Sequence, residues 1–280
     1  MDIITLLFRQ NVIMLIYLLV GYLLYKKKLL TAQGSGEMGK VLLYVIMPVA
    51  IIRSYIQEFS MEYLYGFLIS FAAAALALIL AMAVSTLIFG RRSSIRQFGA
   101  AFSNAGFIGI PLVQMTLGEQ AVFYVASFVA ILNILQWTFG VYVITKDKSA
   151  VSFKKIRTNP IVISFVIGIL LFLLPIQVPG LLSDVIGTLA SMNGPMAMIV
   201  LGAYLAQISM KELFTDKETY ACAAVRPILI PLLTMLLLFL VPGQYAPIRF
   251  AVLLAAAAPV GSNVAIFAQQ FLITAVPAKD

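Results

Sequence analysis

Histidine is absent from the 280 residues of this chain, and cysteine occurs once, as Cys222. Without histidine, the chain lacks the side chain that most often moves protons or binds metal near neutral pH. A single cysteine allows no internal disulfide and cannot assemble a metal site. An intramembrane enzyme would need paired aspartates, a serine with a histidine, or a metal cluster, and the sequence offers none of these sets. We therefore expect no cofactor, no metal and no enzymatic activity.

Charge is also scarce, because 11% of the residues are charged, against about one-quarter in an ordinary soluble domain. The acidic residues all fall in predicted loops or at the ends of apolar stretches: Asp2, Glu37, Glu58, Glu62, Glu119, Asp147, Asp184, Glu212, Asp216, Glu218 and Asp280. A carboxylate inside a span is the usual proton relay of pumps and antiporters. A carboxylate-driven proton antiporter is therefore disfavoured, whereas Na⁺ or H⁺ coupling through other groups, such as backbone carbonyls, stays open.

Apolar residues are what the chain has in abundance, at 62% of the total. A helix needs about 20 apolar residues to cross the hydrocarbon core of a membrane. Nine stretches meet or approach this length: Ile3–Tyr25, Met38–Ile56, Tyr63–Phe89, Gln97–Leu117, Ala121–Thr145, Pro160–Val178, Val185–Ile208, Tyr220–Val241 and Ile248–Ile273. Backbone polar groups must be satisfied internally in lipid, so each stretch is expected to be helical. The sequence thus predicts an all-α, polytopic membrane protein, whose first stretch is a spanning helix rather than a signal peptide.

The formal charge of +8 comes from basic residues in the short connections between these stretches. On one side lie Lys26, Lys27, Lys28, Lys40, Arg91, Arg92, Arg96, Lys146, Lys148, Lys154, Lys155, Arg157, Lys211, Lys217 and Arg226. The other side holds Arg9, Arg53 and Arg249, and Lys279 falls in the tail after the ninth span. Because basic loops stay in the cytoplasm, we expect a multi-pass protein of the cell membrane with its N-terminus outside. A basic, aromatic-rich surface for nucleic acid is not indicated.

Two spans are interrupted by glycine, proline and small polar residues. These are the fourth span, at FSNAGFIGIPLV (residues 102–113), and the ninth, at AAAAPVGSNVAIFAQQF (residues 255–271). Aligned with each other, they place Gly109 in register with Gly261. Five spans separate the pair, an odd number, so the second copy must be inverted in the membrane. Inverted repeats with broken helices are typical of secondary transporters whose site lies near the bilayer midplane.

These repeats divide the chain into residues 1–150, with five spans, and residues 151–280, with four. A complete second repeat would need a tenth span after Phe271, but only LITAVPAKD follows. We therefore expect either that the chain is truncated or that the protein lacks the last helix of the second repeat.

The interruptions define the candidate site. Proline removes a backbone donor and frees a carbonyl four residues earlier, so Pro111 and Pro259 are expected to break the two helices. If the breaks cross, half-helix N-termini can hold an anion and unwound carbonyls a cation. The expected site is polar but formally uncharged, with Arg226 extending to the headgroups. Its predicted substrate-binding residues are Asn104, Gly106, Gly109, Pro111, Pro259, Gly261, Ser262 and Asn263. Alternatively, such residues serve only to pack helices together.

Three motifs, NAGFIGIPL (residues 104–112), LGAYLA (residues 201–206) and APVGSNVAIFAQQF (residues 258–271), resemble the auxin efflux carrier family, which includes plant auxin carriers and bacterial permeases for malate and malonate. The resemblance implies ten helices in two inverted five-helix repeats, and an elevator-like movement of crossing helices four and nine against a scaffold of helices one, two, six and seven. It also implies a homodimer.

By the same resemblance, Asn104 matches a substrate-contacting asparagine, Pro111 the proline of the crossing, and Pro259 with Gly261 the opening of the ninth helix. The plant carriers have a second proline where this chain has Val264, which favours a bacterial-type carrier.

Two functions are consistent with these features. The leading one is a secondary transporter, or permease, for a small organic anion such as malate or another carboxylate, embedded in membrane lipid. The alternative is a non-transporting binding or sensor protein built on the same scaffold. Uptake of a labelled dicarboxylate into vesicles would separate the two.

Overall fold

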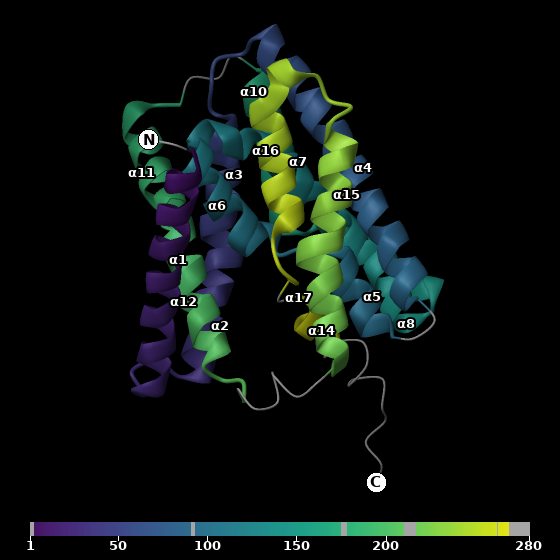
Figure 1. The fold of residues 1–280 in the computed structure, drawn as a ribbon. Helices are drawn as coiled ribbons and strands as arrows, with labels where there is room; N and C mark the ends of the chain where they lie inside the picture. The colour runs from purple at the N-terminus through teal and green to yellow at the C-terminus, as the bar shows by residue number, and fades with distance from the viewer. Residues whose placement is uncertain (1–2, 91–92, 175–177, 210–216, 262, 269–280) are drawn as a thin grey trace.

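The computed structural model describes residues 3–90, 93–174, 178–209, 217–261 and 263–268. Within these ranges every regular element is a helix, and the only strand-like pairing is an isolated bridge between Ser103 and Val260. Figure 1 shows the helices as one bundle, with α1 (Ile3–Lys26) near one side and α4 (Met61–Phe89) near the other. The prediction of an all-α protein is confirmed.

Five helical stretches among the described residues are long and apolar enough to cross a membrane: Ala32–Tyr55, Met61–Phe89, Glu119–Thr145, Gly180–Leu205 and Tyr220–Leu238. They correspond to the predicted second, third, fifth, seventh and eighth spans. A sixth is obtained if Lys148–Arg157 and Pro160–Leu173, which meet at an angle of 47°, count as one bent span. Large apolar side chains stay exposed along these helices, as Leu76 does on α4 and Leu236 on α15 (Ile230–Leu238). The molecule is thus a multi-pass membrane protein.

Several long helices are composite. Their segments are α2 (Ala32–Val41), η1 (Leu42–Ile46) and α3 (Met47–Tyr55); α7 (Glu119–Leu135), η3 (Gln136–Gly140) and α8 (Val141–Thr145); α11 (Gly180–Ser191) and α12 (Asn193–Leu205); and α14 (Lys217–Ala224), η5 (Val225–Leu229) and α15. The connection before α10 (Pro160–Leu173) carries η4 (Lys148–Ala150) and α9 (Phe153–Arg157), and η6 (Gly243–Tyr245) precedes the last span.

Proline explains three of the π-helical segments. Pro48, Pro111 and Pro231 each stand at the second residue of an α-helix that directly follows a π segment. A proline in a helix clashes with the carbonyl four residues earlier. The wider π turn moves that carbonyl aside, so the chain stays helical through the proline.

The predicted fourth and ninth spans are each broken into two half-helices. The fourth consists of α5 (Ser94–Ala101), then η2 (Ala105–Gly109) continuing into α6 (Ile110–Leu117). The ninth consists of α16 (Ala246–Ala257) and α17 (Asn263–Ala268). The prediction that these two spans are interrupted is confirmed. That the two halves of the chain are inverted copies stays a prediction, and the segment in which a tenth span is expected to be missing lies outside the described residues.

The tightest helix pair is α1 with α12. A Cβ added at Gly21 would overlap the carbonyl oxygen of Ile199, and one added at Gly202 would overlap that of Leu18. The two backbones therefore touch, which only glycine permits, and close packing of this kind holds membrane helices together. In Figure 1 this pair lies beside α2, on the opposite side of α16 from α4.

Candidate functional site

The two breaks lie against each other in the middle of the bundle. The amide nitrogen of Asn104 donates to the carbonyl oxygen of Pro259 at 2.7 Å, and the Gly261 amide donates to the carbonyl of Phe102 at 3.4 Å. Together with the antiparallel bridge from Ser103 to Val260, these bonds form a short two-stranded contact. Irregular backbone is tolerated inside a membrane protein only where such partners satisfy it. We call residues 102–104 and 258–261 the crossover.

The fourth span breaks at residues 102–104 and not at Pro111, so the predicted cause of this break is wrong. The second half-helix starts where the Asn104 carbonyl accepts bonds from Ile108 at 2.9 Å and Gly109 at 3.2 Å. Pro111 lies inside that half-helix, because the π turn of η2 accommodates its ring. Pro259, in contrast, lies in the break itself, as predicted.

Arg226 is fully buried at the crossover. Its Nε donates to the carbonyl of Ala258 at 3.3 Å, and its Nη1 donates to those of Ala100 at 3.1 Å and Ala101 at 3.4 Å. Its Nη2 donates to the carbonyl of Ala256. These carbonyls lie at the C-terminal ends of α5 and α16, where unpaired carbonyls carry partial negative charge. One guanidinium therefore holds both half-helix ends.

Two predictions fail at this residue. Arg226 does not extend to the headgroups, and the crossover is not formally uncharged, because an arginine keeps its proton under all ordinary conditions. The physical reason is that four inward-facing carbonyls supply the partners that a buried cation requires.

The predicted glycines lie in close contacts, Gly106 against a side chain and Gly109 and Gly261 against the backbone of another segment. A Cβ on Gly106 would come within 2.6 Å of Met47 Cε, one on Gly109 within 3.3 Å of Ala255 Cα, and one on Gly261 within 3.3 Å of the Ser103 carbonyl oxygen. These contacts favour packing as one function of the glycines. Their part in substrate binding stays a prediction.

Asn104 is 6% exposed, and the structure records no hydrogen bond of its side-chain amide with another described residue. The neighbouring Ser103 hydroxyl is buried without a partner as well. Buried polar groups are normally paired, so these two are available to a ligand or to water. The predicted site residue Ser262 lies outside the described residues.

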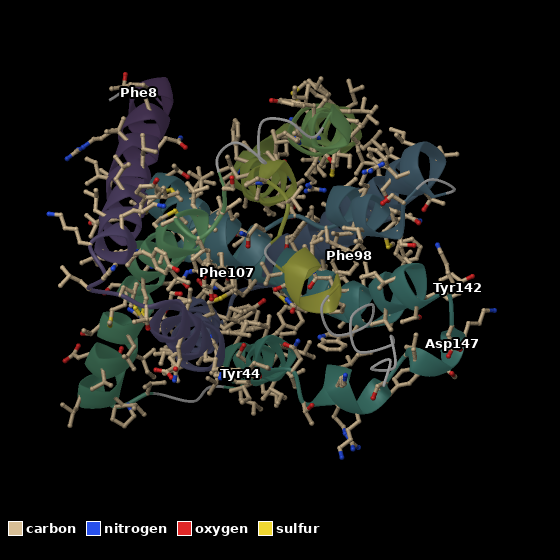
Figure 2. All side chains as sticks on the ribbon, turned by 90° about the horizontal axis from the view of Figure 1, so that it is seen from below. Phe8, Tyr44, Phe98, Phe107, Tyr142 and Asp147 are labelled. Atoms are coloured by element: carbon tan, nitrogen blue, oxygen red, sulfur yellow. The ribbon has the colours of Figure 1, made fainter. Side chains whose placement is uncertain are left out.

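A cavity of about 340 Å³ opens beside α17. We call it the lysine-side cavity, and its lining residues are Leu43, Tyr44, Asn133, Gln136, Trp137, Lys155, Thr158, Asn159, Pro160, Asn263 and Phe267. Among the predicted site residues that the structure describes, Asn263 alone is in this lining. Figure 2, seen from below, shows Tyr44 and Phe98 on either side of the region around α17.

Amide side chains line this cavity in two bonded pairs. Asn263 Nδ2 donates to Gln136 Oε1 at 2.9 Å, and Asn159 Nδ2 donates to Asn133 Oδ1 at 3.3 Å. Asn159 Oδ1 also accepts from the Ile161 amide, which caps α10. The Nε2 of Gln136 is buried without a partner. Asn133 and Gln136 were not predicted, although polar residues inside an otherwise apolar span were a signal that could have found them.

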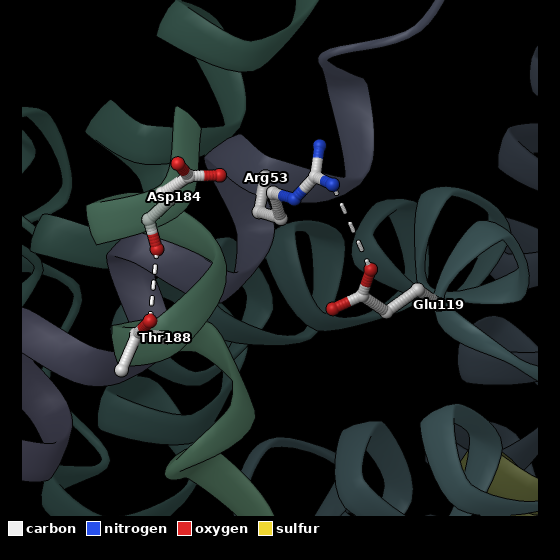
Figure 3. A network of polar contacts seen from close by, with 4 residues as sticks. All are labelled: Arg53, Glu119, Asp184 and Thr188. Atoms are coloured by element: carbon white, nitrogen blue, oxygen red, sulfur yellow. Dashed lines mark hydrogen bonds and ion pairs between the residues drawn. The ribbon is translucent and has the colours of Figure 1, made fainter. Parts of the chain in front are cut away.

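A second cavity, of about 370 Å³, lies at the opposite end of the bundle. Figure 3 shows its ion pair, in which Arg53 at the end of α3 reaches toward Glu119 at the start of α7, with 4.0 Å between the charged atoms. Asp184 and Thr188 on α11 lie near Arg53 in the same view, joined by a bond from the Thr188 hydroxyl to the Asp184 carbonyl. Arg53, Glu58 and Glu119 all line this cavity, so this end presents both cationic and acidic groups.

Comparison with known proteins gives two findings. The chain is 29% identical over 200 residues to a protein of Rhizobium meliloti (strain 1021) named "Putative malonate transporter", and the alignment covers 66% of this chain and 61% of that protein. The sequence pattern of the family described as "Membrane transport protein" matches residues 6–157 and 148–274. This match confirms the resemblance to the auxin efflux carriers and covers nearly the whole chain. The chain therefore belongs to the membrane transport protein family, to which the auxin efflux carriers belong.

Proposed function

We propose that this membrane transport protein is a secondary transporter that carries a small organic anion, most simply a short carboxylate. The observation that carries the proposal is the crossover. Arg226 neutralises the carbonyl ends of its two half-helices. The side-chain amide of Asn104 and the polar side chains that line the nearby lysine-side cavity then stay available to a ligand. The malonate named for the relative is a carboxylate of this class.

The movement we propose is elevator-like. The lysine-side cavity lies between η1, which supplies Tyr44, and the group formed by η3 and α17, which supplies Trp137 and Phe267. The backbones of α1 and α12 touch, and α12 packs against α2 and η1, so this pair makes a firm support beside η1. If the crossover and the half-helices that it joins slide along this support, they would carry a bound ligand across the membrane without rebuilding the binding site.

The orientation we propose follows from the basic connections. Loops rich in lysine and arginine stay in the cytoplasm, which places the N-terminus outside the cell membrane. The lysine-side cavity then opens to the cytoplasm, because Lys155 and Thr158 lie in the basic connection between α8 and α10. Coupling to Na⁺ or H⁺ and assembly as a homodimer stay predictions.

The test is uptake of ¹⁴C-labelled malonate into proteoliposomes that contain the purified chain, with empty liposomes as the control. Accumulation or exchange above the control supports transport. Saturable binding to the solubilised protein without any uptake would instead assign a binding or sensor role. Runs with Na⁺ replaced by K⁺, and runs with an imposed pH gradient, identify the coupling ion.

A further inference from the structure

An ion pair links α3 to α7 at the end of the bundle that carries the second cavity, which is the outer end in the proposed orientation. Arg53 Nη2 lies 4.0 Å from Glu119 Oε2, and the two side chains are 30% and 48% exposed. A long ion pair in contact with water contributes little to stability. It is therefore weak enough to break and form again in every cycle, as a contact across a moving boundary must.

The two partners belong to different parts of the bundle. The helix that carries Arg53, α3, packs against α10 and α11. The helix that begins at Glu119, α7, packs against α6 and α16, which are half-helices of the two interrupted spans. It is joined to α6 by Gly118 alone, whose φ is 90°. A slide of the crossover along its support would therefore carry Glu119 away from Arg53.

A second acidic residue lies near Arg53 on its own side of this boundary. A Cβ added at Gly187 would lie 3.8 Å from Arg53 Nε, so the arginine side chain passes along α11 at that residue. Asp184 stands three residues earlier, on the same face of the helix, and Figure 3 shows it on the other side of Arg53 from Glu119.

Both groups are ready for such a contact. Among the described residues, the structure records no ion pair for Asp184. The Nε of Arg53 is buried and has no hydrogen-bond partner there, and a buried donor without an acceptor is costly. Arg53 thus has a donor to spare in the state seen here, and Asp184 has a carboxylate without a cation.

We propose that Arg53 is a two-partner switch that sets the balance between the two end states of the elevator-like movement. Arg53 pairs with Glu119 in the state seen here, and it turns to Asp184 when the crossover slides, so its charge is compensated in both states. This inference rests on the proposed function and adds the residue that biases the movement. A simple surface ion pair would give Asp184 no effect, and an exchange of the two charges of the pair would restore wild-type behaviour.

The test follows the exposure of Trp137, the single tryptophan of the chain, which lines the lysine-side cavity at the opposite end of the bundle. This cavity is open in the state seen here and would close when the crossover slides. Time-resolved emission of the purified full chain in acrylamide, a neutral quencher, separates an accessible fraction of Trp137 from a shielded one. Because the substituted residues lie at the other end, the ratio of the fractions reports the balance of states and needs no transport assay.

Two single substitutions should shift this ratio in opposite directions. Glu119→Gln removes the partner used in the state seen here, so the accessible fraction should fall. Asp184→Asn removes the alternative partner, so the accessible fraction should rise. Each ratio should change about two- to fivefold, the effect of one exposed ion pair. Glu58→Gln removes an acid from the same outer cavity and is the matched control, which should behave as wild type.

Exchanging the charges sharpens the test. In the double variant Arg53→Glu with Glu119→Arg, the exchanged pair still attracts, but the new acid at position 53 repels Asp184. The accessible fraction should therefore stay above that of wild type, and adding Asp184→Lys should bring it back toward the wild-type value. Circular dichroism checks that each variant is folded.

The negative results separate the two proposals. Unchanged ratios in both single variants, shifts in the same direction, or a wild-type ratio in the double variant would each overturn the switch and leave the transport proposal intact. If the wild-type chain takes up no labelled malonate while the single variants shift Trp137 in opposite directions, the switch stands and the proposed transport fails.

Discussion

The two sides of the crossover are balanced in different ways. The C-terminal ends of α5 and α16 are held by the guanidinium of Arg226, a group that belongs to the fold. Among the described residues, no side chain caps the start of the η2–α6 half-helix with a hydrogen bond, and its first flanking residue is the neutral Asn104. Half-helix starts carry partial positive charge and half-helix ends partial negative charge. The protein thus supplies its own cation for the negative ends, and under the proposed function the anion would bind at the positive start of the η2–α6 half-helix.

This comparison predicts that Arg226 is mainly needed for folding. Arg226→Met would leave four buried carbonyls without their donor, at a cost of about 1–3 kcal/mol for each group that stays unsatisfied. We expect the unfolding temperature in detergent to fall by roughly 10 °C or more. Differential scanning fluorimetry with a thiol-reactive or aggregation readout measures it.

Arg249→Met is the matched control for this prediction. Arg249 also donates to carbonyls near a helix end, those of Phe239 and Val241, but it lies away from the crossover and is partly exposed. Its loss should lower the unfolding temperature by only about 2–4 °C, the effect of about 1 kcal/mol in a chain of this size. If both substitutions lowered the unfolding temperature equally, Arg226 would contribute no more to stability at the crossover than an arginine at an ordinary helix end.

A substitution at Asn104, on the other side of the crossover, should affect transport and not stability. Asn104→Ala removes a buried amide that makes no hydrogen bond with a described residue, so the unfolding temperature should change little. Uptake of labelled malonate should fall about tenfold, because a ligand hydrogen bond to a buried site is worth about 1.4 kcal/mol. Normal uptake by a folded Asn104→Ala protein would remove Asn104 from the binding site and leave the glycine contacts as packing alone.

Composition and periodicity were enough to predict the class of fold and the positions of the interrupted spans, because lipid forces long apolar stretches into helices and Gly/Pro clusters interrupt them. They were not enough to place the first break, which was expected at Pro111. A π turn accommodates the ring of Pro111 within the helix, and the irregular backbone lies at residues 102–104 instead. Arg226 was misread for a related reason. A lone basic residue near the end of a span has the same sequence pattern whether it reaches the headgroups or turns inward.

The lysine-side cavity could not be predicted from the sequence either. Gln136, Lys155 and Asn263 lie far apart along the chain, and only the packing of η3, α9 and α17 brings them to one wall. Asn263 alone was predicted, because it follows the second break. Side chains that meet through tertiary packing leave no local pattern.

The two prolines give the finest test of where the breaks lie. In Pro259→Ala the new amide could bond to the carbonyl of Ala255 and extend α16 into the crossover, which would compete with the bond from Asn104 to residue 259. We expect uptake to fall several-fold. Pro111 lies inside a half-helix that is already formed, so Pro111→Ala should stay within about twofold of wild type, because its effect is limited to one restored helical bond of about 0.5–1.5 kcal/mol. Kinetics of malonate uptake measure both variants side by side. A larger loss in Pro111→Ala than in Pro259→Ala would mean that the π turn, and not the crossover, is the part that must bend during transport.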